Sequence, residues 1–179
     1  MNDHEKLNEI IAGCQRGSNE AFSKLVDIYK TRCYGYFYRL TGDTAKSNDL
    51  LSELFLRLVE KIRSYRGSSF ESWLFTIASN IFNDYLRQKY RQKKLIDGKT
   101  QQLNFDTSPA ASDTEMLDKL QEKMAKLDRE TAELLTLRFY GQLSFKELAV
   151  IRSEPIGTTL SKVHRGLKKL KELMENTNE

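Results

Sequence analysis

Apolar residues recur at every third or fourth position through the first half of the chain, which is the spacing of amphipathic helices. The pattern predicts helices over residues 4–14, 19–40, 44–64 and 69–92. Ser68 and Glu71 have the spacing of a capping box at the start of the fourth helix. No segment alternates as a strand does, so the expected fold is all-α. The clearest apolar stripe lies in the third helix and consists of Leu50, Leu51, Leu54, Phe55, Leu58, Val59 and Ile62.

The helical pattern stops over residues 95–112, where glycine, proline, serine and paired glutamines accumulate. Such a composition predicts a flexible linker. Helical spacing then resumes and continues to the end of the chain. We therefore expect two small helical domains, at residues 1–94 and 113–179, joined by this linker.

The last quarter of the chain has the pattern of a helix-turn-helix. Ser144 and Glu147 have capping-box spacing and predict the start of a short helix, while a left-handed Gly141 would end the helix before it. Residues 152–154 form the predicted turn, and Pro155 suits the first position of the next helix. That helix has an apolar stripe made of Ile156, Leu160, Val163, Leu167, Leu170 and Met174.

The opposite side of this last helix is polar and cationic. Hydroxyl groups and an arginine can reach base edges in a major groove, while lysines meet phosphates. The alternative is an ordinary solvated face whose cations suit the end of the helix dipole. The short first helix, the turn and the one-sided charge together favour DNA recognition. The residues on this side are Thr158, Ser161, Lys162, Arg165, Lys168 and Lys169.

A second surface of this kind follows the polar edge of the predicted fourth helix. An aromatic ring beside amide and guanidinium groups can stack on an unpaired base while cations hold the backbone. The alternative for Trp73 is a place at the margin of the core. The edge carries Trp73, Asn80, Asp84, Arg87 and Arg91.

On the third helix, Glu53 and Arg57 have the spacing of an intrahelical ion pair, and docking to a protein is the alternative.

The composition of the chain limits which partners, cellular location and cofactors are expected. The 179 residues carry a net charge of +4, so a nucleic-acid surface should be local. No apolar run approaches the roughly 20 residues of a membrane span, and the N-terminus lacks a signal-peptide pattern, so we expect a cytoplasmic protein. Cys14 and Cys33 fall on apolar helical positions and are expected to be buried thiols, with a redox pair or metal site as the alternative. His4 and His164 lack metal-ligand spacing, so no cofactor is expected.

Three stretches, in order and nearly spanning the chain, resemble the extracytoplasmic-function (ECF) sigma factors of the bacterial sigma-70 family. They cover residues 42–57, 70–87 and 134–165. The resemblance implies a non-enzymatic subunit that binds core RNA polymerase and directs it to promoters. The N-terminal domain resembles sigma region 2, the C-terminal domain resembles region 4, and the linker would thread through the polymerase cleft.

The resemblance also implies roles for individual residues. The third helix would dock on polymerase through Asp49, Leu50, Glu53, Phe55 and Arg57. The −10 element would be bound and opened by Tyr65, Arg66, Ser69, Trp73, Asn80, Asp84, Arg87 and Arg91. The −35 element would be read by Ser144, Thr158, Thr159, Ser161, Lys162, Arg165, Lys168 and Lys169.

Some positions depart from the family pattern. Ser47-Asn48 and Ser52 replace the usual Ala-Glu and Gln of the polymerase-binding helix. Thr159-Leu160 replaces the usual Val and basic residue, and we interpret Leu160, at the margin of the apolar stripe, as a packing residue. Glu154 in the turn disfavours a close phosphate.

Polymerase would fix the separation of the two domains and make promoter binding bivalent. Free in solution, the domains could instead pack together and hide both DNA-binding faces. Many relatives are silenced by an anti-sigma factor, which makes such a protein a candidate partner. The alternative function is a stand-alone helix-turn-helix regulator, which would bind a two-half-site operator tightly as a dimer and without polymerase.

Overall fold

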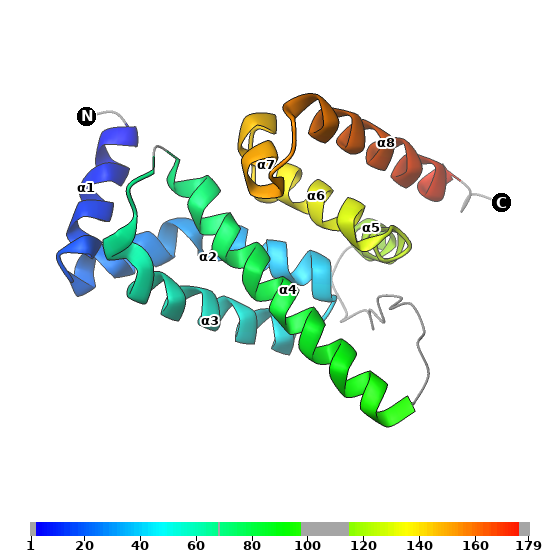
Figure 1. Ribbon diagram of the computed structural model, residues 1–179, viewed down its shortest axis with the longest axis horizontal. Coiled ribbons are helices and arrows are strands. Elements are labelled where there is room, and N and C mark those ends of the chain that lie inside the picture. Colours follow the sequence, from blue (N-terminus) through cyan, green and yellow to red (C-terminus); the bar gives the residue numbers. More distant parts are fainter. Residues whose placement is uncertain (1–2, 68, 98–114, 176–179) are drawn as a thin grey trace.

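The structure, a computed structural model, describes residues 3–67, 69–97 and 115–175, and all regular elements in these ranges are helical (Figure 1). The predicted all-α fold is confirmed. Of the predicted linker, residues 95–97 belong to the last helix of the N-terminal half, and residues 98–112 lie outside the described residues. The elements are α1 (Asp3–Gln15), α2 (Asn19–Thr41), α3 (Thr44–Lys61), the 3-10 turn η1 (Ile62–Ser64), α4 (Phe70–Asp97), α5 (Glu115–Ala125), α6 (Arg129–Phe139), α7 (Phe145–Arg152) and α8 (Ile156–Glu175).

Side-chain caps fix where these helices begin. Ser144 and Glu147 form the predicted capping box of α7, in which each side chain accepts a hydrogen bond from the other residue's backbone N–H. The cap of α4 differs from the expected one, because Ser69 accepts from the Ser72 N–H at 3.2 Å. Glu71 instead accepts from the Tyr29 hydroxyl at 2.6 Å, and Ser68 lies outside the described residues. The cap therefore sits one residue later than the sequence suggested.

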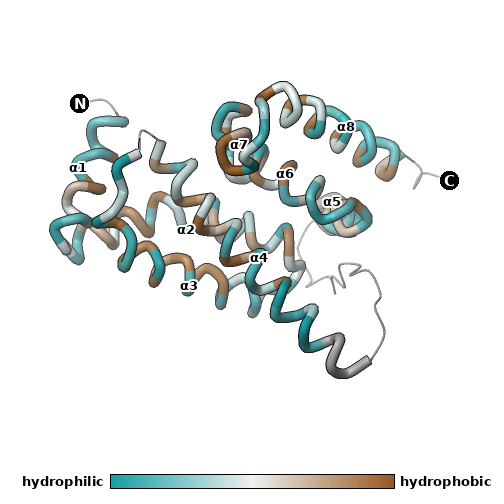
Figure 2. Tube along the Cα trace, viewed as in Figure 1, coloured by the Kyte–Doolittle hydropathy of each residue, from teal (hydrophilic) through white to brown (hydrophobic). Residues whose placement is uncertain are grey.

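The N-terminal helices α1 to α4 pack around an aromatic core. Hydrophobic positions recur along each helix between hydrophilic ones (Figure 2). Tyr36 packs edge-on against Phe37 and Phe75, and all three are fully buried. Both cysteines are free and buried, as expected, and burial raises the pKa of the Cys33 thiol to about 12. This core gives α3 and α4 a rigid support for their outer faces.

The C-terminal helices α5, α6 and α7 each pack against α8. The buried side of α8 is rotated relative to the apolar stripe expected from the sequence. Its buried residues are Thr159, Val163 and Gly166. A Cβ atom on Gly166 would lie 2.7 Å from the Thr131 methyl group, so α8 approaches α6 closely at this glycine. Ile156, Leu160 and Leu167, which the stripe placed inside, are exposed. The interpretation of Leu160 as a packing residue is therefore wrong.

Gly141 is required for a different reason from the one expected. Its backbone is not left-handed, and the left-handed residue of this turn is Gln142, with φ of 54°. A Cβ atom on Gly141 would lie 2.5 Å from the Leu137 carbonyl oxygen, which accepts the Leu143 N–H at 3.3 Å. Because that oxygen is backbone and already bonded, it cannot move aside without distorting the end of α6.

We expect Gly141→Ala to lower the free energy of unfolding by about 1–3 kcal/mol, as overpacked sites do. Urea unfolding followed by circular dichroism measures this. Gly157→Ala is the matched control, because among the described atoms nothing lies within 4 Å of a Cβ there. Alanine in that helix should be neutral or stabilising by up to about 1 kcal/mol. Equal effects of the two variants would contradict this account of Gly141.

Candidate nucleic-acid interface

The polar face of α8 is open to solvent over most of its length. Thr158, Ser161 and Arg165 are exposed, and so are Lys168 and Lys169. Thr159 is different, because its side chain is fully buried and its hydroxyl donates to Glu154 at 2.9 Å. Of the residues expected to read DNA from this helix, Thr159 therefore does not lie on the surface.

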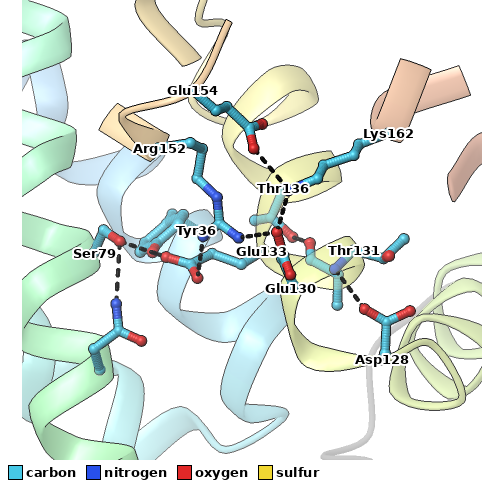
Figure 3. A network of polar contacts seen from close by, with 12 residues as sticks. Tyr36, Ser79, Asp128, Glu130, Thr131, Glu133, Thr136, Arg152, Glu154 and Lys162 are labelled. Atoms are coloured by element: carbon cyan, nitrogen blue, oxygen red, sulfur yellow. Dashed lines mark hydrogen bonds and ion pairs between the residues drawn. The ribbon is translucent and has the colours of Figure 1, made fainter. Parts of the chain in front are cut away.

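Lys162 lies at the edge of this face and is held by two carboxylates. Its Nζ is 2.7 Å from an oxygen of Glu130 and 2.7 Å from an oxygen of Glu154 (Figure 3). Arg152 also contacts Glu130, at 2.9 Å. Hydrogen bonds from Lys162 and Arg152 lower the pKa of Glu130, so this carboxylate stays ionised at neutral pH. The charge of Lys162 is thus already compensated within the protein.

The loop between η1 and α4 is held by an aromatic cluster and by the first helix. The centroid of the Trp73 ring lies 5.1 Å from that of Tyr65 and 5.6 Å from that of Phe70. Trp73 is half-buried. The side-chain amide of Gln15 donates to the carbonyls of Ile62 and Tyr65 at 3.2 and 3.1 Å. Sequence reasoning missed Gln15, because nothing in the spacing connects it to a loop about 50 residues away.

The α4 surface beyond the loop is accessible. Asn80, Arg87 and Arg91 are exposed, and Arg87 pairs with Asp84 at 3.1 Å. Arg66 donates to the carbonyls of Arg63 in η1 and of Tyr65 in the loop, and its side chain remains exposed. Polar and cationic groups therefore follow the outer side of α4, as the sequence predicted.

The outer side of α3 carries the expected ion pair and an unexpected apolar patch. Arg57 and Glu53 are 2.7 Å apart, and Leu50 is buried in the core, so Leu50 is not presented to a partner in this structure. Leu56 and Val59 are 67% and 53% exposed. Val59 was assigned to the buried stripe, and Leu56 was missed because periodicity alone does not mark an exposed leucine.

The surfaces on α3 and α4 adjoin. Both helices line one polar groove of about 330 Å³. The predicted polymerase-binding and −10 surfaces are therefore neighbours in space. The groove is lined by Lys46, Asp49, Leu50, Glu53, Arg57, Ile81, Asp84, Tyr85, Arg87, Gln88 and Arg91.

The two halves of the chain pack against each other through a buried polar network, α2 and α4 lying against α6 and α7. Glu133 of α6 is 1% exposed, and its carboxylate accepts from the Tyr36 hydroxyl at 3.1 Å and from the Ser79 hydroxyl (Figure 3). Arg152 lies 3.3 Å from the same carboxylate. Burial, and then the charge of Glu133, raises the pKa of Tyr36, so its hydroxyl stays a donor. The network joins α2 and α4 to α6 and α7.

A second contact between the halves involves the loop that precedes α4. The Ser69 hydroxyl donates to Glu147, the capping residue of α7. Arg32 donates to the Gly141 carbonyl, and the Gln121 amide donates to the carbonyls of Tyr38 and Arg39. Ser69 and Ser79 are therefore engaged by the C-terminal half, while α8 lies on the far side of α6 from the N-terminal helices (Figure 1).

Among the described residues, no group of His, Cys, Asp and Glu side chains is arranged to hold a metal ion. No helix in the described ranges combines the length and apolarity that a membrane span needs.

The chain matches two protein-family models and several known proteins. Sigma-70 region 2 matches residues 25–92, and Sigma-70, region 4 matches residues 117–170. The chain is 29% identical to the ECF RNA polymerase sigma factor SigW of Bacillus subtilis, over 95% of this chain and 97% of that protein. It is 30% identical to SigM of the same organism, over 84% of this chain and 93% of that protein.

Solved structures share the fold. The sigma factor RpoE in complex with the anti-sigma factor NepR from Bartonella quintana has a TM-score of 0.73 and 24% identity, over 86% of this chain and 96% of that chain. CnrH in complex with the cytosolic domain of CnrY has a TM-score of 0.72 and 17% identity, over 93% of this chain and 96% of that chain. With both family regions matched in order over the helices described above, this chain belongs to the ECF group of the sigma-70 family and is a non-enzymatic RNA polymerase sigma factor that directs promoter-specific transcription initiation.

Proposed function

We propose that the two DNA-recognition tasks of this sigma factor are divided between α8 and the outer surface of α4 with its preceding loop. The observation that carries this is the presence of two polar, cationic helix faces, one in each half of the chain, that are exposed at Arg165 and at Asn80, Arg87 and Arg91. In this assignment α8 reads the −35 element, the loop and α4 bind and open the −10 element, and α3 docks on core polymerase.

The docking role of α3 is supported by its exposed chemistry. Leu56 and Val59 form an apolar patch beside the Glu53–Arg57 ion pair. Apolar side chains near a polar rim are typical of protein interfaces. Leu50 supports this surface from inside the core and does not itself make the contact.

Promoter binding requires the two halves to separate. Positions −35 and −10 are about 25 base pairs apart, or about 85 Å along B-form DNA at 3.4 Å per base pair. A globular chain of this length has a radius of gyration of about 16 Å, so the packed arrangement cannot reach both elements. We infer that core polymerase holds the halves apart, which frees Ser69 and Ser79 from Glu147 and Glu133.

An anti-sigma factor is a further proposed partner. The structurally similar RpoE was solved in complex with such a protein. In this chain an apolar groove of about 230 Å³ opens where the halves meet, beside the 55% exposed ring of Phe139. Its lining consists of Arg39, Leu120, Met124, Leu135, Thr136, Phe139, Tyr140, Leu167 and Leu170. Pull-down from the source cell, followed by mass spectrometry, tests for this partner and for the large polymerase subunits.

The division of tasks is tested by run-off transcription with core polymerase on promoters in which the −10 and −35 elements are randomised separately. Asn80→Ala should change which −10 sequences are used and leave the −35 preference as it is. Asn19→Ala, an exposed amide on α2, is the control and should change neither. An unchanged −10 preference in Asn80→Ala would contradict the assignment of α4.

A further inference from the structure

Leu160 lies on the outside of the proposed recognition helix, where the sequence pattern placed a packing residue. Its side chain is 39% exposed, whereas that of Thr159 is fully buried. Successive side chains on a helix are about 100° apart, so burying Thr159 turns Leu160 toward solvent. The buried hydroxyl is stabilised by its hydrogen bond to Glu154 at 2.9 Å.

The neighbours of Leu160 on the helix surface leave it accessible to a duplex. Residues three or four positions apart on a helix are surface neighbours, and for Leu160 these are Ile156, Gly157, Val163 and His164. Val163 is buried in the core, whereas Ile156, Gly157 and His164 are exposed, and a Cβ on Gly157 would have no described atom within 4 Å. Leu160 and Ile156, which is 54% exposed, form an apolar edge beside Ser161.

The polar groups nearest this edge already form hydrogen bonds or ion pairs within the protein. The Ser161 hydroxyl donates to the Gly157 carbonyl at 2.9 Å. Lys162 contacts Glu130 and Glu154, both at 2.7 Å. An apolar side chain here offers neither a donor nor an acceptor to a guanine or an adenine edge. The apolar group that unmodified DNA presents in the major groove is the thymine 5-methyl group.

We propose that Leu160 is a specificity-determining residue that contacts the 5-methyl group of one thymine in the −35 element. This rests on the proposed role of α8. A single isolated exposed leucine is ordinary on a protein surface. Here, however, an open glycine, Gly157, lies on the helix surface between the leucine and the cationic side of α8, which carries Arg165 and Lys168, and lets a groove edge approach. The contact would make one T·A pair preferred at a fixed position.

Replacing thymine by deoxyuridine tests the contact because it removes only the methyl group. Holoenzyme, formed with core polymerase, is measured by competition on promoters in which each −35 thymine is replaced in turn. We expect one position at which the native protein loses about fourfold in affinity, the value of one buried methyl-sized group. Leu160→Ala should bind the thymine promoter less well and should not distinguish the two bases. Ile28→Ala, an exposed apolar residue of α2, should keep the discrimination.

Leu160→Arg is a second test, in which the base preference should change and not simply be lost. An arginine at this place can bond guanine O6 and N7, so the preferred base at the same position should change from thymine to guanine. Uracil sensitivity that persists in Leu160→Ala would overturn the proposal. Absence of uracil sensitivity at every −35 position would overturn it too, even while Arg165→Ala still loses −35 preference. If scrambling the −35 element has no effect on the native protein, the role of α8 itself fails.

Discussion

Arg165→Ala is expected to weaken −35-dependent promoter binding by about 1–3 kcal/mol, or about 5- to 150-fold. The guanidinium is exposed at the middle of the α8 polar face, and its Nε makes a long 3.4 Å contact with the Ser161 carbonyl of its own helix. It is therefore available to bond guanine O6 and N7 with two parallel hydrogen bonds. Lys162, by contrast, is already paired with two carboxylates, so its loss should cost less.

Run-off transcription from promoters with intact or scrambled −35 elements measures this effect. Arginine contributes both a positive charge and a planar guanidinium that can donate two parallel hydrogen bonds. Arg165→Lys separates these contributions, because lysine keeps the charge and lacks the guanidinium. The lysine variant should keep the salt dependence of binding and lose the base preference. Lys171→Ala, a charge change at an exposed site further along α8, is the control. Unchanged −35 preference in Arg165→Ala would contradict the placement of this helix in the groove.

The helices and their main caps could be predicted, because periodicity and capping residues are local signals. Ser144 and Glu147 form their capping box entirely within α7. The rotation of α8 could not be predicted, since its buried side includes Thr159 and Gly166, which carry little hydrophobic signal. The buried threonine is stabilised here because its hydroxyl donates to Glu154 at 2.9 Å, with the Pro155 carbonyl at 3.5 Å. The apolar stripe therefore pointed to Leu160 where the structure buries Thr159.

The contact between the two halves was suggested by the sequence only as a general alternative, and its residues were not identified. Glu133 is a charged residue on a helix, for which exposure is the ordinary expectation. Its partners Tyr36 and Ser79 lie 97 and 54 residues away in the chain. Burial of this carboxylate depends on three-dimensional proximity that neither spacing nor composition encodes. The same holds for Ser69, whose contact with Glu147 spans 78 residues.

Glu133→Ala is expected to weaken the contact between the two halves by about 2–4 kcal/mol, because Tyr36 and Ser79 each lose a charged acceptor. Both hydroxyls then lie buried without that partner unless the halves separate and water reaches them. Arg152 still has its ion pair with Glu130, at 2.9 Å, so the fold of the C-terminal half should persist. The variant should therefore open, and its radius of gyration, measured by small-angle scattering, should rise above the value of about 16 Å for the packed chain.

Glu130→Ala is the matched control for this change. Glu130 contacts the same arginine, and its described contacts, with Arg152 and Lys162, lie within the C-terminal half. Its loss should therefore leave the radius of gyration as it is. If packing of the halves opposes promoter binding, Glu133→Ala should also reach half-maximal transcription at a lower concentration of core polymerase, because less binding energy is used to separate them. Equal expansion of both variants, or none in Glu133→Ala, would show that this carboxylate does not hold the halves together.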